Sequence, residues 1–147
     1  MPVSPEIAES NRVQRERLRK LVASLDEAGL RTRLANGWTV AGTLGHIAFW
    51  DRQRLCLLQR WAAGDFQSGA YGSDVFNDAV APLLEMIPPA QIAAAAVAAA
   101  EEVDGLLLEL SDDVIADALS RPDPPHVNRG EHRAIHLDRI EEALGGR

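Results

Sequence analysis

The chain has 147 residues, of which 46% are hydrophobic and 25% are charged. This composition excludes a disordered or collagen-like chain and predicts one globular domain over residues 1–147, large enough to bury most of its apolar surface without disulfides. The formal net charge of −7 argues against a nucleic-acid partner, because phosphate backbones are bound by clustered Lys and Arg side chains.

The N-terminus and the lack of a long apolar stretch predict a cytoplasmic protein. The opening MPVSPEIAES lacks the apolar core of a signal peptide, and no stretch approaches the apolar length of a membrane helix, so no membrane partner is expected. Cys56 is the only cysteine, and no internal disulfide can form. Because it lies within the apolar run Leu55–Leu58, we expect a small buried side chain, with a catalytic thiol as the minority alternative.

The first predicted helix runs from about residue 5 to 27. Ser4 can cap it, and Pro5 suits the first helical position, where its missing N–H costs nothing. Apolar residues then recur at helical spacing as far as Leu25. Gly29 is expected to help end this helix.

A second helix is predicted from about residue 40 to 63. Thr39 caps its start and Gly64 stops it. The segment from Gly64 to Asp74 is too rich in glycine to be regular, which makes it a candidate for lining or covering a site.

The rest of the chain alternates helices with proline-containing breaks. A short helix over 75–86, interrupted by Pro82, precedes an alanine-rich third long helix over about 89–110. A further helical turn or two is predicted over 111–119, and the last helix over about 130–144.

These elements predict an all-α chain. No run shows the alternation of apolar and polar residues that is typical of a β-strand. Four principal helices favour a four-helix bundle, a fold whose core commonly holds metals or ligands on facing helices. The small side chains of Ala93–Ala100 would suit close contact between helices, and they support the possibility of a homodimer.

Three of the four histidines fall where a bundle can bring them together. His132 and His136 are four residues apart on the last helix, so both imidazoles project from one face and can hold one ion. His46, on the second helix among small and apolar residues, is the natural third donor. Neutral imidazole suits zinc, nickel, iron or copper. His126 lies in a proline-rich loop and is not expected to be a ligand.

Each histidine also has a simpler interpretation. A pair spaced H-x-x-x-H on a short polar helix is more often two solvated histidines, and His46 alone is more often a core histidine bonded to a backbone carbonyl. The occurrence of three of only four histidines on two facing helices favours the metal site. Such a site would leave a position open on zinc or nickel, which can activate a bound water or thiol near neutral pH.

Acidic residues near the predicted ligands do not share their face. Glu131 and Asp138 lie about 100° and 200° around the helix from the neighbouring histidines, so both are predicted to face solvent. Asp51 has three possible roles: orienting His46, anchoring a neighbouring helix, or forming a surface ion pair with a nearby arginine.

Aromatic residues suggest the walls of a pocket. Three tryptophans lie on or beside the second helix, where they form either an apolar substrate pocket or ordinary core. Trp50 follows His46 by one turn and is expected closest to the metal. Tyr71 and Asn77 are possible pocket residues on the strength of their location alone.

Two segments resemble the DinB superfamily. NGWTVAGTLGHIAFWD, residues 36–51, resembles the family's second-helix motif, in which a Trp-Ser/Thr pair begins the helix and a histidine follows about two turns later. NRGEHRAIHLDRIE, residues 128–141, is similar to the last helix of the family, where two histidines four apart supply ligands. The resemblance carries the ligand role to His46, His132 and His136. It implies a DinB/YfiT-like four-helix bundle with a divalent ion, often nickel or zinc, and frequent homodimers.

The same resemblance suggests a range of activities. The superfamily includes thiol-dependent S-transferases that use bacillithiol or mycothiol and a mycothiol-dependent maleylpyruvate isomerase. A related branch resembles colibactin self-resistance hydrolases, which need not hold a metal. All three histidines are present here, which favours the metal-binding branch, although Gly42 stands where a capping-box acid often sits.

The function implied is therefore that of a metal-dependent S-transferase or hydrolase acting on an electrophilic small molecule. A transferase would use a low-molecular-weight thiol as co-substrate. The residues alone do not separate an enzyme from the alternative, a non-catalytic, stress-related bundle that binds a metal or another ligand.

Overall fold

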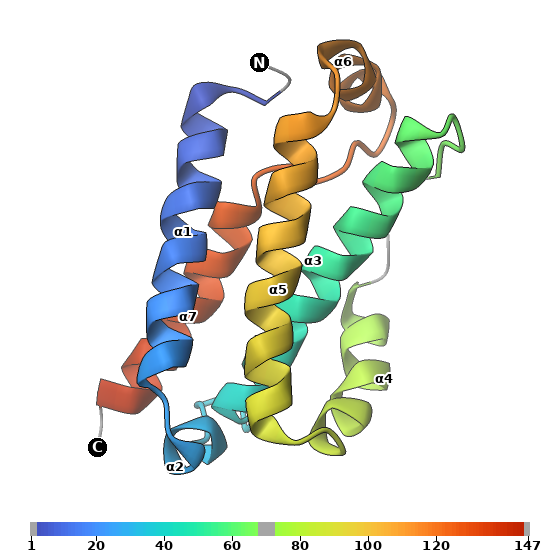
Figure 1. The fold of residues 1–147 in the computed structure, drawn as a ribbon. Helices are drawn as coiled ribbons and strands as arrows, with labels where there is room; N and C mark the ends of the chain where they lie inside the picture. The colour runs from blue at the N-terminus through green and yellow to red at the C-terminus, as the bar shows by residue number, and fades with distance from the viewer. Residues whose placement is uncertain (1–2, 68–72, 146–147) are drawn as a thin grey trace.

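The computed structural model describes residues 3–67 and 73–145, and within these stretches the chain is all-helical (Figure 1). The helices are α1 (Pro5–Ser24), α2 (Glu27–Arg31), α3 (Val40–Ala62), α4 (Ser73–Glu85), α5 (Pro89–Glu109), α6 (Asp112–Ser120) and α7 (Arg129–Gly145). No β-strand occurs among the described residues, which contain only an isolated bridge between Arg33 and Thr39. The prediction of an all-α chain is confirmed.

The four longest helices enclose the main core. α1 packs against α5 and α7, and α3 packs against the same two helices, so the four form a closed ring (Figure 1). They correspond to the four principal helices expected from the sequence, but the described residues form seven helices. Of the shorter ones, α4 packs against α3, α6 contacts α3, and α2 contacts α3 and α5.

The first helix ends earlier than predicted. Its start is as expected, with Ser4 as the cap, but α1 stops at Ser24 and Leu25 is extended. Asp26 then caps α2, and its Oδ1 accepts a hydrogen bond from the backbone N–H of Gly29 at 2.7 Å. Gly29 was expected to help end the first helix. It lies inside α2 instead, because Asp26 caps a new helix three residues before it.

The alanine-rich part of α5 faces the core. Ala93, Ala96, Ala99 and Ala100 are all buried in the cluster that α5 shares with α3. Their small side chains let the two helices approach closely, and these four alanines do not form a free surface. Ala94, Ala95 and Ala98 of the same stretch are exposed, and the homodimer stays a prediction.

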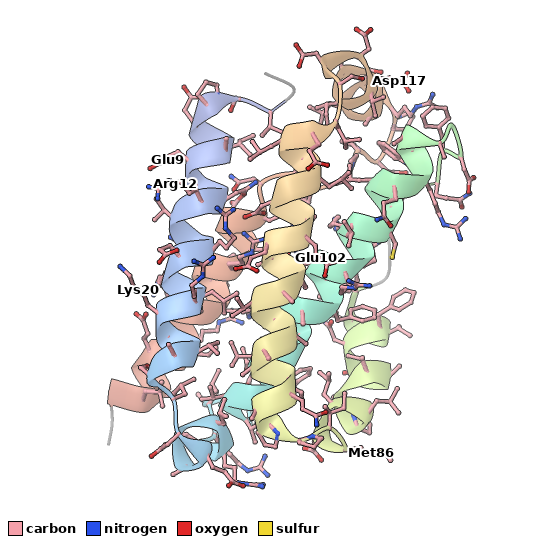
Figure 2. The ribbon with its side chains drawn as sticks, in the orientation of Figure 1. Glu9, Arg12, Lys20, Met86, Glu102 and Asp117 are labelled. Atoms are coloured by element: carbon pink, nitrogen blue, oxygen red, sulfur yellow. The ribbon has the colours of Figure 1, made fainter. Side chains whose placement is uncertain are left out.

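Helix α4 docks against α3 at a glycine. A Cβ atom added at Gly45 would lie 2.7 Å from a methyl group of Leu84, so the absence of a side chain allows this close packing. The predicted interruption at Pro82 is wrong, because α4 continues through that residue. Apolar side chains remain exposed on and after this helix, among them Val75, Leu83 and Met86, which points away from the bundle in Figure 2.

Charged side chains cover the outer face of α1. Glu9, Arg12 and Lys20 point away from the bundle in Figure 2, and Arg12 pairs with Glu9 at 2.7 Å.

Cys56 on α3 is exposed, which contradicts the expected burial, because its position turns outward between the buried Leu55 and Leu57. None of the helices within residues 3–67 and 73–145 is long and apolar enough to cross a membrane.

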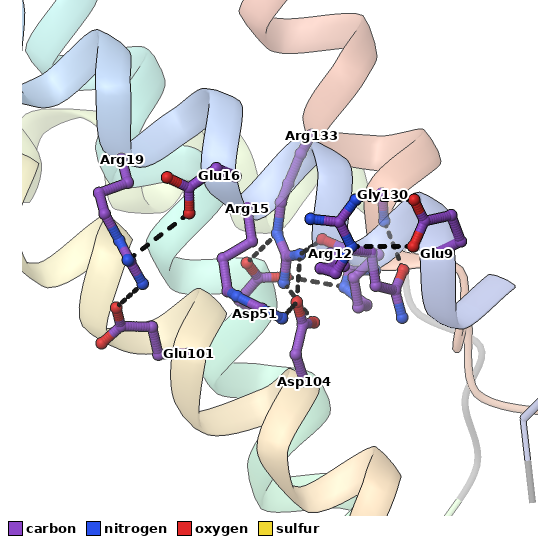
Figure 3. A network of polar contacts seen from close by, with 12 residues as sticks. Glu9, Arg12, Arg15, Glu16, Arg19, Asp51, Glu101, Asp104, Gly130 and Arg133 are labelled. Atoms are coloured by element: carbon purple, nitrogen blue, oxygen red, sulfur yellow. Dashed lines mark hydrogen bonds and ion pairs between the residues drawn. The ribbon is translucent and has the colours of Figure 1, made fainter.

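A buried ion-pair network ties α7 to the other long helices (Figure 3). Asp51 on α3 is 0% exposed and accepts hydrogen bonds from Nε of Arg129 at 2.8 Å and from Nε of Arg133 at 2.9 Å. Asp104 on α5 accepts two hydrogen bonds from Arg133, each at 2.9 Å, and one from Arg15 of α1 at 2.6 Å. Asp51 therefore anchors a neighbouring helix, one of the three roles considered for it, and is not a surface residue.

The start of α7 is also held from α1. The side chain of Asn11 donates to the backbone carbonyl of Val127 at 3.0 Å and accepts from the backbone N–H of Gly130 at 2.7 Å. A Cβ atom added at Gly130 would lie 2.4 Å from the carbonyl oxygen of Ser10, so only glycine allows this approach. The first turns of α7 are thus fixed by backbone packing as well as by ion pairs.

Candidate metal centre

Three histidines gather between α3 and α7. Nε2 of His46 lies 3.2 Å from Nε2 of His132, and the ring of His136 lies 4.3 Å and 4.7 Å from the rings of His46 and His132, between centroids. One ring nitrogen from each histidine lies within 4.8 Å of the others. Two nitrogens bound to one tetrahedral zinc ion are about 3.4 Å apart, so the donor set fits such an ion. The cluster is compatible with metal binding.

The spacing of residues on α7 explains why the histidines meet His46. Arg129 and Arg133 are four residues apart, and His132 and His136 follow each of them by three residues, about 60° around the helix. When both arginines bind Asp51, the adjacent stripe of histidines lies beside α3. His46 precedes Asp51 by five residues on that helix and meets them there.

A cavity of about 590 Å³ lies over the cluster. Its walls come from α3, α4, α7 and the segment before α7. Besides the three histidines, the lining residues are Trp50, Arg54, Ser73, Asn77, His126, Arg129, Glu131 and Ile135. A cavity of this size beside a group of donor atoms can hold a small molecule.

Trp50 and Asn77 join α3 to α4 in the cavity wall. The indole Nε1 of Trp50 donates to Oδ1 of Asn77 at 2.9 Å, and a hydrogen bond between Asn77 and His46 favours the protonated ring of the histidine. Asn77 thus touches a member of the cluster, although the sequence suggested it by location only. Any contact of either residue with a substrate stays a prediction. Tyr71, the other expected pocket residue, lies outside the described residues.

The remaining polar candidates are spread around the rim. His126 is exposed and lines the cavity, but it does not belong to the three-histidine group. Glu131 is exposed as predicted and also lines the cavity. Asp138 is exposed as predicted and pairs with Arg17 at 2.8 Å, away from the cavity.

Burial and nearby arginines keep the imidazoles neutral. The pKa of His46 is lowered, that of His132 is lowered to about 2 and that of His136 to about 4, and burial is the largest cause in each case. The positive charge of Arg129 contributes to the lowering of all three pKa values, and that of Arg139 contributes for His46 and His136. The three rings are therefore neutral near pH 7, which is the state that a metal ligand requires.

Sequence reasoning missed the arginines of the site. Arg54 and Arg129 line the cavity, and Nη2 of Arg129 lies 3.2 Å from Nδ1 of His132. A signal for Arg129 was present, because the spacing of Arg129 and Arg133 repeats that of the two histidines. Nothing in the local sequence around Arg54 distinguishes it from the exposed Arg52 on the same helix.

Comparison with known proteins adds a family. The sequence model of the DinB superfamily matches residues 11–137, a range that reaches from α1 into α7 and includes His46, His132 and His136. Searches of curated proteins and of solved structures gave no match.

Proposed function

The chain belongs to the DinB superfamily, and from this premise we propose that it binds one divalent transition ion, zinc or nickel, through His46, His132 and His136. The observation that carries the proposal is the convergence of three neutral ring nitrogens within 4.8 Å. The group contains no carboxylate, which suits zinc or nickel better than magnesium or calcium.

We propose further that the site is catalytic and acts on an electrophilic small molecule by thiol-dependent S-transfer or by hydrolysis. An ion held by three neutral histidines keeps a position open and lowers the pKa of a bound water or thiol. The adjoining cavity of about 590 Å³ gives space for a substrate next to that position. Trp50 and Ile135 provide apolar wall, and the charges of Arg54 and Arg129 favour an anionic nucleophile.

In S-transfer, the thiol sulfur forms a bond to the electrophilic carbon and the leaving group departs with its bonding electrons. The thiol proton must pass to a base. His126 and Glu131 line the cavity and are the groups proposed to accept it. In hydrolysis, the oxygen of water takes the place of sulfur and the same two groups take its proton.

The alternative is a non-catalytic bundle that binds a metal or another ligand. One observation favours it: the donor group consists of three histidines that an ion would occupy, and it includes no carboxylate to act as a base beside the ion. A screen of electrophiles with and without added thiol separates the possibilities. Turnover that requires thiol supports transfer, turnover without thiol supports hydrolysis, and absence of both supports the non-catalytic bundle.

Metal content of untagged protein tests the ion site. We expect about one zinc or nickel ion per chain in wild type and strong loss in His46→Ala, His132→Ala and His136→Ala, because two imidazoles hold an ion far less well than three. His126→Ala is the matched control, since it removes an imidazole from the wall of the same cavity and should retain the ion. Equal metal in wild type and His46→Ala, or loss in His126→Ala alone, would show that the ligands are wrongly assigned.

A homodimer and a small-molecule substrate complete the proposal. Sedimentation at high micromolar concentration tests the dimer, and a species of only about 16 kDa would contradict it.

A further inference from the structure

Arg129 contacts one ligand histidine on the side away from the cluster. Its Nη2 lies 3.2 Å from Nδ1 of His132, and its Nε donates to Asp51 at 2.8 Å. An arginine side chain has donors only and stays protonated, so Nδ1 of His132 must be the acceptor. The single proton of a neutral His132 is therefore on Nε2, as its hydrogen-bond partners assign it.

That proton points at the second histidine. Nε2 of His132 lies 3.2 Å from Nε2 of His46, so His132 donates and His46 accepts. His46 then carries its own proton on Nδ1. Arg129, His132 and His46 form a chain of two hydrogen bonds, and the arginine fixes the direction of both.

An ion requires the opposite tautomer at His132. A ring nitrogen that binds a metal carries no proton, so ligation through Nε2 moves the proton of His132 to Nδ1, opposite a donor of Arg129. Ligand histidines ordinarily donate this second N–H to a carboxylate, a carbonyl or water. Arg129 offers none of these and brings a positive charge toward the ion.

We infer that Arg129 limits the metal affinity of the histidine cluster by holding His132 in the tautomer that donates to His46. An ion entering the site must break the His132–His46 hydrogen bond and displace the contact of Arg129 with Nδ1. Asp51 keeps Arg129 in place, because the guanidinium is 2% exposed and bound through Nε. Arg129 is thus a positioning residue. This inference rests on the proposed ion site and assigns to Arg129 an effect on the affinity of that site for the ion.

Calorimetric titration of zinc into untagged, metal-free protein tests this effect of Arg129. The four proteins compared are wild type and the variants Arg129→Gln, Arg129→Lys and Arg139→Gln. Arg129→Gln removes the charge and replaces an obligate donor with an amide whose oxygen can accept from Nδ1–H. Arg129→Lys keeps the charge and the donor. Arg139→Gln is the matched control for charge, because Arg139 lies on the same helix and its charge acts on His46 and His136. No hydrogen bond from Arg139 to a ligand histidine is present among the described residues.

We expect Arg129→Gln to bind zinc at least about tenfold more tightly than wild type, the range by which partners of ligand histidines change affinity. Arg129→Lys should stay within about threefold of wild type, and Arg139→Gln should gain less than Arg129→Gln. Equal gains in Arg129→Gln and Arg139→Gln would show that charge alone acts, and would overturn the inference. Unchanged or weaker binding by Arg129→Gln would overturn it as well.

The tautomer itself can be read without any metal. In a two-bond ¹H–¹⁵N spectrum of chelator-treated wild type, we expect the pattern of an Nε2–H ring at His132. An Nδ1–H pattern would overturn the inference while leaving the proposed function intact. If none of the four proteins binds zinc, the proposed ion site fails. The spectrum then decides whether Arg129 sets the tautomer, and this reading does not depend on the folding of any variant.

Discussion

The ion-pair network and the histidine cluster share α3 and α7, where their members lie five positions apart on α3 and three positions apart on α7, and the network also reaches Asp104 of α5 and Arg15 of α1. In the network, the carboxylates of Asp51 and Asp104 are matched by buried arginines. In the cluster, three neutral rings meet without a carboxylate and face a cavity. Matched charges satisfy one another and hold helices together, whereas neutral donors that converge on one point retain lone pairs for a ligand.

The largest effect on the ion-pair network is expected when the carboxylate of Asp51, which binds both Arg129 and Arg133, is removed. Asp51→Ala leaves the buried Arg129 and Arg133 without their common partner, and loss of one member of a buried ion pair costs about 3–5 kcal/mol. Urea denaturation measures the free energy of unfolding. The control is Asp117→Ala, which breaks an exposed pair with Arg121 and should cost less than about 1 kcal/mol. Similar losses in the two variants would contradict the structural role of the network.

A second substitution, Gly130→Ala, should disturb the ion-pair network and the histidine cluster together. Gly130→Ala places a methyl group against the backbone of Ser10, so α1 and α7 must separate, at a cost of about 1–3 kcal/mol. Because the start of α7 carries members of both clusters, metal content should fall together with stability.

Gly105→Ala is the matched control for this substitution. A Cβ atom there meets nothing within 4 Å, and alanine stabilises a helix interior by about 0.5–1 kcal/mol relative to glycine. Thermal denaturation and metal analysis of both variants give the comparison. A Gly130→Ala protein as stable as wild type would show that the contact between α1 and α7 is not tight.

The histidine cluster makes the stability of the metal-free chain depend on pH. In the folded chain the pKa values of His132 and His136 are lowered from 6.5 to about 2 and about 4. The unfolded chain therefore binds more protons as the pH falls below 6.5, so metal-free protein loses stability from that pH down through about 4. Denaturation curves between pH 7 and 4 should show a smaller loss for a His132→Gln/His136→Gln variant than for wild type. Parallel curves would mean that the histidines are not held neutral.

Periodic and capping signals in the sequence predicted most of the fold. The bounds of α3 and α5 follow from caps, glycines and prolines at their ends, and those signals are local. The end of α1 was misplaced because Asp26 starts a new helix, and a cap within a continuous helical pattern is hard to recognise. The exposure of Cys56 was missed for a related reason, since an apolar run does not reveal which of its members turns outward.

The site was predictable only where one residue type stands out. Histidines are rare in this chain, so their positions on two helices pointed to a common centre. Arg129 and Asp51 are charged residues among many, and their burial depends on contacts between segments 78 residues apart. The contact of Arg129 with His132 depends on that distant pairing, so the tautomer of a ligand could not be predicted from its neighbours in sequence.

The two ion pairs of Asp51, with Arg129 and with Arg133, determine which positions of this bundle can be substituted. A slip of α7 by one residue moves it about 1.5 Å and turns it about 100°, which would take both guanidiniums away from the carboxylate. The height of His132 and His136 is therefore set by Asp51, Arg129 and Arg133, and of these three only Arg129 also lines the cavity. Positions such as Ile135 and Arg54 can be redesigned to accept new substrates while the three donor atoms stay in register, which is what a starting point for directed evolution requires.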